Sequence, residues 1–304
     1  MLDVRRLRLL RDLDRLGTIA AVAAAHTYSP SAVSQQLDVL EREVGVPLLE
    51  RAGRGVRLTD AGRLLSHHAG ILLTAAEAAR ADLASLTGEV RGTVRAGGLQ
   101  SATRRVLIPA VARMLVDHPQ VRVEVSELEL EQALPELRLG ALDLVVSDEY
   151  AGHPRPRPAG LTFEPLHEEP LRLVLPAAHP CAEHGGPVAL AALREDVWVA
   201  SATGTGHHAL VVGACRSLGG YEPDLRHRSN DADVQLELVR RTGAVALMPT
   251  LALPAADPTI AVRDITEAAV TRRLMIITRD GRTPPALDTY LATVRDQARR
   301  ATTG

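Results

Sequence analysis

The chain has 304 residues with a formal net charge of −2, and 46% of its side chains are hydrophobic, 24% charged and 2% aromatic. This composition is typical of a globular protein with two or three domains, and the near-neutral charge excludes an overall basic surface, so any nucleic-acid site must be local. No apolar run is long enough to cross a membrane, and Cys181 and Cys215 make no disulfide framework, so we expect a cytoplasmic protein without a membrane partner.

Leucines spread over residues 2–16 predict a first helix that Gly17 ends. Thr18 is suited to cap a second helix over residues 19–26, whose alanines permit close packing against neighbours. Residues 27–29 then form a tight connection. Two short helices joined in this way to a third are typical of a helix-turn-helix.

Residues 29–43 predict that third helix, and the N-terminal region is organised around it. Ser29 is suited to cap its start and Pro30 to occupy its first turn, while Gly45 follows its end. Apolar residues at positions 33, 37, 40 and 44 share one face.

A second face of this helix carries Ser31, Ser34 and Gln35. Short hydroxyl and amide side chains can bond base edges and phosphates in the major groove of DNA. A solvated helix face is the alternative for such a pattern in isolation, so its neighbours must decide.

The next segment, residues 48–58, predicts a hairpin that turns at residues 53–55. It carries Arg51, Arg54 and Arg57 beside a single acid, Glu50. A hairpin rich in arginine next to a recognition helix is typical of a winged variant, whose wing contacts phosphates or the minor groove.

Thr59 is suited to cap a long helix that reaches about residue 86. Its apolar residues recur at alternating spacings of four and three, which is a heptad seam. Packing of one amphipathic helix against its own domain is the alternative. The strict seam favours pairing of two chains, with the dimer contact assigned to Leu65, Leu72, Ala79, Leu83 and Leu86.

The motifs of residues 1–88 together resemble the LysR-type transcriptional regulators. The matching stretches are residues 17–18, 20–21, 29–36, 40–41, 45, 47–49, 51 and 58–62, with Leu49 at a position where the family usually has phenylalanine. The resemblance implies a winged helix-turn-helix over residues 1–58, a linker and dimerisation helix over residues 59–88, and an effector-binding domain over residues 89–304. It also implies double-stranded DNA as a partner and a dimer that assembles into a tetramer. The DNA-binding residues are expected to be Thr18, Ser29, Pro30, Ser31, Ser34, Gln35, Arg51 and Arg54.

Beyond a hinge at residues 88–92, short strands and helices alternate, which predicts an α/β fold with a mainly parallel sheet. Strands are expected at residues 93–97, 121–126, 142–147, 171–175, 197–200, 244–248 and 274–278, and helices at residues 104–117, 131–139, 206–218, 231–241 and 285–300. Residues 151–158 are rich in proline and are interpreted as a crossing between two lobes. Lobe I then comprises residues 93–150 and 265–304, and lobe II comprises residues 160–264. This pattern resembles the two-lobed effector domain of the family, which shares its fold with type 2 periplasmic binding proteins.

A small-molecule effector is expected in the cleft between the lobes. Residues 100–103 precede the first helix of lobe I, where free backbone N–H groups favour an anion, and residues 203–207 form the matching loop of lobe II. By resemblance both loops face the effector, which is expected to be a small carboxylate. The expected effector-binding residues are Gln100, Ser101, Ala102, Thr103, Ser147, Thr203, Gly204, His207 and Asn230.

Other constellations carry weaker hypotheses. His179, Cys181 and His184 are close in sequence, but a metal site is not expected there, and no cofactor is expected anywhere. Cys181 and Cys215 leave open a redox-controlled regulator, and a ligand-independent regulator is the further alternative. An enzyme on the same two-lobed fold is the alternative from another class, although the sequence contains no recognised catalytic motif.

Overall fold

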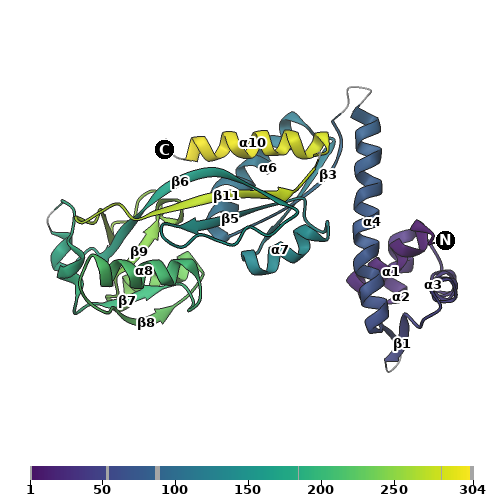
Figure 1. Ribbon diagram of the computed structural model, residues 1–304, viewed down its shortest axis with the longest axis horizontal. Helices are drawn as coiled ribbons and strands as arrows, with labels where there is room; N and C mark the ends of the chain where they lie inside the picture. Colours follow the sequence, from purple (N-terminus) through teal and green to yellow (C-terminus); the bar gives the residue numbers. More distant parts are fainter. Residues whose placement is uncertain (1, 53–54, 86–89, 184, 282, 302–304) are drawn as a thin grey trace.

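The computed structural model describes residues 2–52, 55–85, 90–183, 185–281 and 283–301. Figure 1 shows a small N-terminal head, a long helix α4 (Asp60–Ser85) beside it, and an elongated two-lobed α/β body. Lobe I lies next to α4 and lobe II lies at the far end of the body.

The head consists of α1 (Val4–Leu16), α2 (Ile19–His26), α3 (Pro30–Val44) and a hairpin of β1 (Leu49–Ala52) and β2 (Gly55–Leu58). Its helix boundaries agree with those expected from capping. Gly17 ends α1 with φ 73°, and the Thr18 hydroxyl accepts the Ala21 N–H at the start of α2. The turn into α3 has Thr27 in the left-handed region, with φ 57°. The predicted wing tip at residues 53–54 lies outside the described residues.

One apolar cluster holds the head together. The predicted stripe of α3, with Val33, Leu37 and Leu40 fully buried, packs against leucines of α1. At the foot of α4, Gly62 passes so close to the hairpin that an added Cβ would lie 2.1 Å from the Leu48 carbonyl oxygen. Only glycine permits this approach, and it fixes the hairpin against the long helix.

The predicted seam of α4 is divided between two environments. Leu65 and Ala69 pack into the apolar cluster of the head, so this part of the seam contacts its own domain. Leu72, Ala79 and Leu83 are exposed, with Leu72 47% and Leu83 68% accessible to solvent. The exposed part of the seam therefore begins at Leu72, beyond the segment of α4 that packs against the head. Residue 86 of the predicted seam lies outside the described residues.

Lobe I is built on β3 (Gly92–Gly98), β4 (Val121–Glu127), β5 (Leu144–Tyr150) and β11 (Thr271–Arg279). The full sheet has the order β10-β6-β11-β5-β3-β4, with β3 parallel to β4 and β5, and β11 antiparallel to β5. One face is covered by α6 (Ile108–Asp117) and α10 (Pro285–Ala301), and the other by α7 (Leu130–Arg138).

The first helix of lobe I starts earlier than the sequence suggested. Residues 100–103 were expected to be a loop, but α5 (Gln100–Ala102), a π-helical turn (Thr103–Leu107) and α6 form one continuous helix. The Thr103 hydroxyl donates to the Gly98 carbonyl, and Ala102 is buried in the lobe I core. These contacts with the lobe I core continue the helix through residues that were expected to form a loop.

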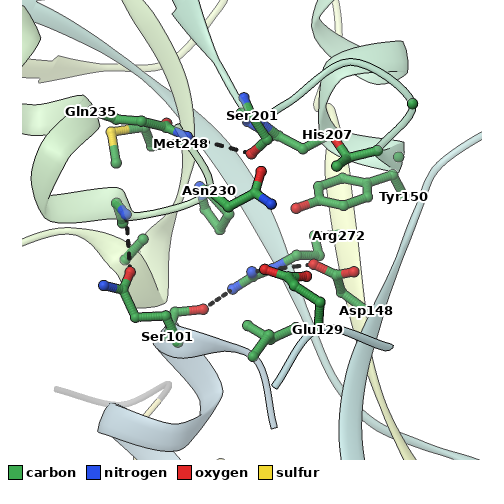
Figure 2. Close-up of a pocket in the computed structure, with 18 of the residues that line it drawn as sticks. Ser101, Glu129, Asp148, Tyr150, Ser201, His207, Asn230, Gln235, Met248 and Arg272 are labelled. Carbon is green, nitrogen blue, oxygen red and sulfur yellow. Dashed lines mark hydrogen bonds and ion pairs between the residues drawn. The ribbon is translucent and has the colours of Figure 1, made fainter. Parts of the chain in front are cut away.

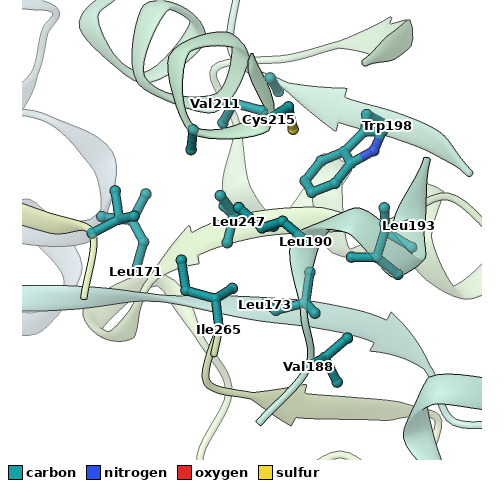
Figure 3. Packing of buried hydrophobic residues seen from close by; sticks show 14 of the residues in the cluster. Leu171, Leu173, Val188, Leu190, Leu193, Trp198, Val211, Cys215, Leu247 and Ile265 are labelled. Carbon is teal, nitrogen blue, oxygen red and sulfur yellow. The ribbon is translucent and has the colours of Figure 1, made fainter. Parts of the chain in front are cut away.

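Lobe II contains β7 (Val197–Ala200), β8 (Asp224–Arg228), β9 (Ala246–Pro249) and β10 (Ile260–Arg263), with α8 (Gly206–Ser217) on one side and α9 (Ala232–Thr242) on the other. Short 3-10 turns at Pro180–Ala182, Leu190–Leu193 and Thr250–Ala252 join these elements. Figure 3 shows its main core, which gathers Trp198 and Cys215 with leucines of β6 and β9. Strands β8 and β10 were missed in the sequence.

The crossing between the lobes lies inside a strand, so its expected position at residues 151–158 was wrong. Strand β6 (Leu161–Pro176) pairs with β11 in lobe I through residue 170 and with β9 and β10 in lobe II from residue 171. The boundary expected at residue 160 is therefore about ten residues early. The first half of β6 was not recognised as a strand in the sequence because it contains Pro165 and Pro170. The register shift between Leu274 and Met275 accommodates Pro165.

Candidate functional site

The exposed face of α3 carries the polar residues expected to contact DNA. Ser31 and Gln35 are exposed and Ser34 is half-buried, while the apolar stripe is turned into the head. Ser29 is occupied in part, because its hydroxyl caps the helix by accepting the Ala32 N–H at 3.2 Å and lies 3.0 Å from the Ser31 hydroxyl. Pro30 is exposed at the first turn.

A hollow of about 500 Å³ lies between the start of α2 and the hairpin. It brings together Thr18 and Arg51, two of the expected DNA-binding residues, with Gly17, Gly55 and Val56 on its wall. The Arg51 side chain is exposed and forms no ion pair with any described residue. By contrast, Arg57 pairs with Glu50 across the hairpin at 2.7 Å, so of the two hairpin arginines that the structure describes Arg51 is the one left to meet an outside anion. Arg54 lies outside the described residues.

The orientation of α3 relative to the hairpin is fixed by Glu41, which the sequence-based assignment of DNA contacts did not include. One carboxylate oxygen of Glu41 accepts the backbone N–H groups of Leu48 and Leu49 at 2.6 and 2.9 Å. On the inner side of α3, Arg6 bonds both Gln36 and Glu43. These contacts hold the helix and the hairpin as one rigid surface.

A cavity with a volume of about 310 Å³ lies between the two lobes of the body. Figure 2 shows side chains from both lobes converging on it. Six of the expected effector-binding residues line it: Gln100, Ser101, Thr203, Gly204, His207 and Asn230. The other three, Ala102, Thr103 and Ser147, do not line the cavity; Ala102 and Thr103 face the sheet from the first helical turn, and Ser147 is buried within β5.

Lobe II contributes an uncharged wall. His207 was expected in the loop of residues 203–207, but it is buried in the first turn of α8. Its Nδ1 accepts the Ser201 N–H at 3.1 Å and its Nε2 donates to the Leu247 carbonyl at 2.8 Å. Burial lowers the pKa of His207, so the ring stays neutral, and its two hydrogen bonds hold it in one orientation. Ser201, Asn230 and Gln235 complete this wall.

Lobe I contributes a charged wall that the sequence did not reveal. Arg272 is buried at the floor, where its Nε donates to Glu169 at 3.0 Å and its Nη2 donates to the Ser101 hydroxyl at 3.1 Å. A second arginine, Arg155, pairs with Glu131 at 2.7 Å and with Asp148 at 3.3 Å. Both arginines of the cavity are therefore engaged by carboxylates.

The lobes are also joined across the mouth of the cavity. The Gln100 side-chain oxygen accepts the Ala232 N–H at 2.9 Å, and its nitrogen donates to Asp231 at 3.0 Å, so one amide bridges lobe I to the start of α9. Arg104 pairs with Asp233 at 3.1 Å. Arg104 thus forms a second contact between the lobes.

The remaining constellations form no comparable site. The two cysteines are not joined, and burial raises the pKa of the Cys215 thiol to about 11, so the reactive thiolate is disfavoured. The His179 ring accepts the Cys181 N–H and contacts Asp196, while residue 184 lies outside the described residues. In the described part of the chain, no group of three or more His, Cys, Asp or Glu side chains could hold a metal ion, and no helix is long and apolar enough to span a bilayer.

Comparison with known families matches both parts of the molecule. Residues 4–63 match the family described as bacterial regulatory helix-turn-helix protein, lysR family, and residues 87–299 match the LysR substrate binding domain. The chain belongs to the LysR family. The expected resemblance and fold class are thereby confirmed.

Two similar proteins are named as transcriptional regulators. The chain is 32% identical over 181 residues to the HTH-type transcriptional regulator PcaQ of Agrobacterium fabrum, which covers 60% of this chain and 57% of PcaQ. It is 26% identical over 259 residues to the regulator GbpR of Azospirillum brasilense, covering 85% of this chain and 75% of GbpR. The match to PcaQ therefore spans little more than half of that protein.

Solved structures of LysR-family proteins share the fold over nearly the whole chain. A full-length OxyR variant from Pseudomonas aeruginosa superimposes with a TM-score of 0.71 at 20% identity, covering 98% of this chain and 95% of OxyR. Full-length CbnR complexed with its target DNA gives a TM-score of 0.70 at 24% identity, covering 98% and 100%. These superpositions show that the fold is shared.

Proposed function

We propose that this LysR-family chain is a sequence-specific DNA-binding regulator of transcription, switched by a small molecule held between its lobes. The observation that carries the proposal is the uncovered polar face of α3, held rigidly beside the Arg51 hollow, in a chain whose body encloses a cavity between two lobes. The DNA complex of the structurally similar CbnR supports the assignment of the head. A protein that acts on chromosomal DNA works in the cytoplasm.

The side chains of the head differ in whether they can contact bases or phosphates. Ser31, Ser34 and Gln35 can exchange hydrogen bonds with base edges, whereas Arg51 offers a charge without fixed geometry and suits a phosphate. Thr18, Ser29 and Pro30 lie at helix starts, where backbone N–H groups can also meet phosphates. Arg54 is proposed as a further phosphate contact.

We also propose that the exposed stripe of α4 pairs two chains and that such dimers assemble further. Leu72, Ala79 and Leu83 are apolar and uncovered over successive turns, which is the pattern of a helix-to-helix contact. A dimer would present two copies of α3 to the duplex. No role in catalysis is proposed, because a regulatory output accounts for both the head and the cavity.

The test is a titration of the full chain on a duplex selected from random sequence and on its scrambled counterpart, at several salt concentrations. Gln35→Ala should cost about 1–3 kcal/mol on the selected duplex only. Arg51→Ala and Arg54→Ala should weaken binding to both duplexes and each lower the salt slope by about one unit.

Arg113→Ala is the matched control, since it removes an exposed arginine that pairs with Asp117 on α6, in the body. It should leave both titrations unchanged. If Gln35→Ala weakens both duplexes equally while Arg51→Ala affects only the selected one, the roles are reversed. If none of the head variants changes binding, the proposal of DNA recognition by this surface fails.

A further inference from the structure

The charge balance of the cavity between the lobes points to the chemical class of its ligand. This inference rests on the proposed function, since it takes that cavity as the effector site. Three acids, Glu129, Glu131 and Asp148, and two arginines, Arg155 and Arg272, line it. The lobe II wall supplies only hydroxyl, amide and neutral imidazole groups.

Neither arginine is available to an incoming anion. Arg272 is 3% exposed and bonds Glu169 beneath the cavity floor, with Asp148 at 3.6 Å on its other side. Arg155 is held by Glu131 and Asp148, and its Nε also donates to the Asp148 carbonyl at 3.1 Å. To reach Arg272, a carboxylate would have to displace the buried Glu169, which costs more than it returns. At Arg155 it would compete with Asp148 and with the exposed Glu131.

Glu129 is the acid left over when these pairs are counted. It is the N-cap of α7 in a capping box, where its side chain faces the Gln132 backbone N–H and its own backbone N–H donates to the Gln132 side chain. In the described part of the chain, no arginine or histidine lies within ion-pair distance of this exposed carboxylate. Burial, and then the nearby charge of Asp148, raise its pKa. Figure 2 shows the Glu129 and Asp148 carboxylates on the same wall of the cavity, facing the Tyr150 ring and Asn230.

We propose that the ligand of this cavity carries a protonated nitrogen group, an ammonium or an amidinium, seated between Glu129, Asp148 and the Tyr150 ring. The carboxylates offer charge-assisted hydrogen bonds and the aromatic face favours a cation. The uncharged wall, with the Asn230 amide and the Ser201 hydroxyl, receives the rest of the molecule. The volume of about 310 Å³ restricts it to a small compound. The carboxylate effector expected from the sequence does not fit this balance of charges.

The experiment uses the full-length chain with four probes in calorimetric titration and thermal unfolding. Agmatine and L-arginine carry the cation, and comparing them separates a simple amine from an amino acid. L-Citrulline keeps the shape of L-arginine but has a neutral urea in place of the guanidinium, so it tests whether the side-chain cation is the group that is bound, and glutarate represents a carboxylate. Agmatine or L-arginine should bind and raise Tm, whereas L-citrulline and glutarate should bind at least about tenfold more weakly.

Glu129→Gln should weaken cation binding about tenfold or more, because it removes the unpaired charge and keeps the shape. It should also raise Tm of the free protein slightly, since the pKa of this carboxyl is raised in the folded chain and folding therefore disfavours its charged form. Glu127→Gln is the matched control: it removes a charge of the same sign two residues away, from an exposed side chain that does not line the cavity. It should change neither measurement.

Preferential binding of glutarate would overturn the inference, as would failure of both cations to bind, or a Glu129→Gln chain that matches wild type. Failure of the proposed function gives a different result. If cations bind in a manner that depends on Glu129 while the selected duplex is not recognised, the ligand class stands and the regulator proposal falls. If the duplex is recognised but no cation binds, only the ligand class falls.

Discussion

The head presents its polar groups on an open outer surface, whereas the body gathers charged groups around the cavity between its lobes. On the head, Gln35 and Arg51 face solvent, and Arg51 has no acidic partner among the described residues. In the body, Arg272 and Arg155 are each engaged by carboxylates. A surface that meets a large anionic polymer can leave its cations exposed, while a cavity that holds a small ligand must balance buried charge before the ligand arrives.

The largest expected effect comes from removing one partner of the buried ion pair between Arg272 and Glu169. Arg272→Met leaves Glu169 buried without its partner and should lower the free energy of unfolding by about 3–5 kcal/mol. The double variant Arg272→Met/Glu169→Met should recover most of this loss, because it removes both charges. Chemical denaturation of the two variants checks this, and equal stability of the single variant and wild type would show that the pair is not structurally required.

A smaller loss is expected from crowding the head. Gly62→Ala places a Cβ 2.1 Å from the Leu48 carbonyl oxygen and should cost about 1–3 kcal/mol, with loss of DNA binding because the hairpin must shift. Gly70→Ala is the control, since nothing lies within 4 Å of its added Cβ and alanine favours the helix by up to about 1 kcal/mol. Thermal unfolding should give a lower Tm than wild type for Gly62→Ala and a higher Tm for Gly70→Ala. A Tm that rises in both variants would refute the close approach at Gly62.

The exposed stripe of α4 predicts a change in assembly. Leu72→Glu places a carboxylate in the proposed apolar contact and should weaken the dimer at least about tenfold. Leu115→Glu makes the same substitution at a leucine of α6 that is 65% exposed, and should leave that dimer intact. Light scattering over a range of concentrations measures both. A dimer lost only in Leu115→Glu would move the contact to the body.

The smallest effect concerns pH. The pKa of Glu129 is raised in the folded chain, so protonation of this group favours folding. Its contribution to stability is complete below the unfolded value of 4.5 and is lost as the pH rises through the folded pKa. Wild type should therefore approach Glu129→Gln in Tm on acidification from neutral pH, by a modest amount because solvent screens the partly open carboxyl. A gap between the two chains that is constant with pH would show that Glu129 does not titrate in this window.

The head could be predicted from the sequence because its signals are local. Ser29, Gly17 and Gly45 act on the residues beside them, and the boundaries of α1, α2 and α3 follow directly from such caps. What local patterns could not give was the division of the α4 seam. Leu65 and Ala69 contact the head only because of how α1 lies against α4, and this depends on tertiary packing.

The cavity was predicted only in its uncharged half. Glycine and hydroxyl residues before α8 marked the lobe II loop, but the charged wall joins Glu129, Asp148 and Arg272 from three separate elements. One signal was available, because Asp148 and Glu149 follow a run of buried residues in β5, at the edge where parallel strands end. Arg272 carried no such signal, since its partner Glu169 is remote in sequence and lies in the half of β6 that was missed.

The two strands that pass between the lobes have a mechanical consequence. At the crossing, the Leu171 N–H donates to the Val270 carbonyl at 2.7 Å, so the connection is a hydrogen-bonded ribbon and not two loose tethers. A ribbon of this kind resists bending within its own plane, which would separate its hydrogen-bonded strands, more than it resists twisting, which preserves their pairing. We therefore expect a ligand to rotate lobe II about the axis of β6 with little opening, leaving the radius of gyration nearly constant while the angle between the lobes changes.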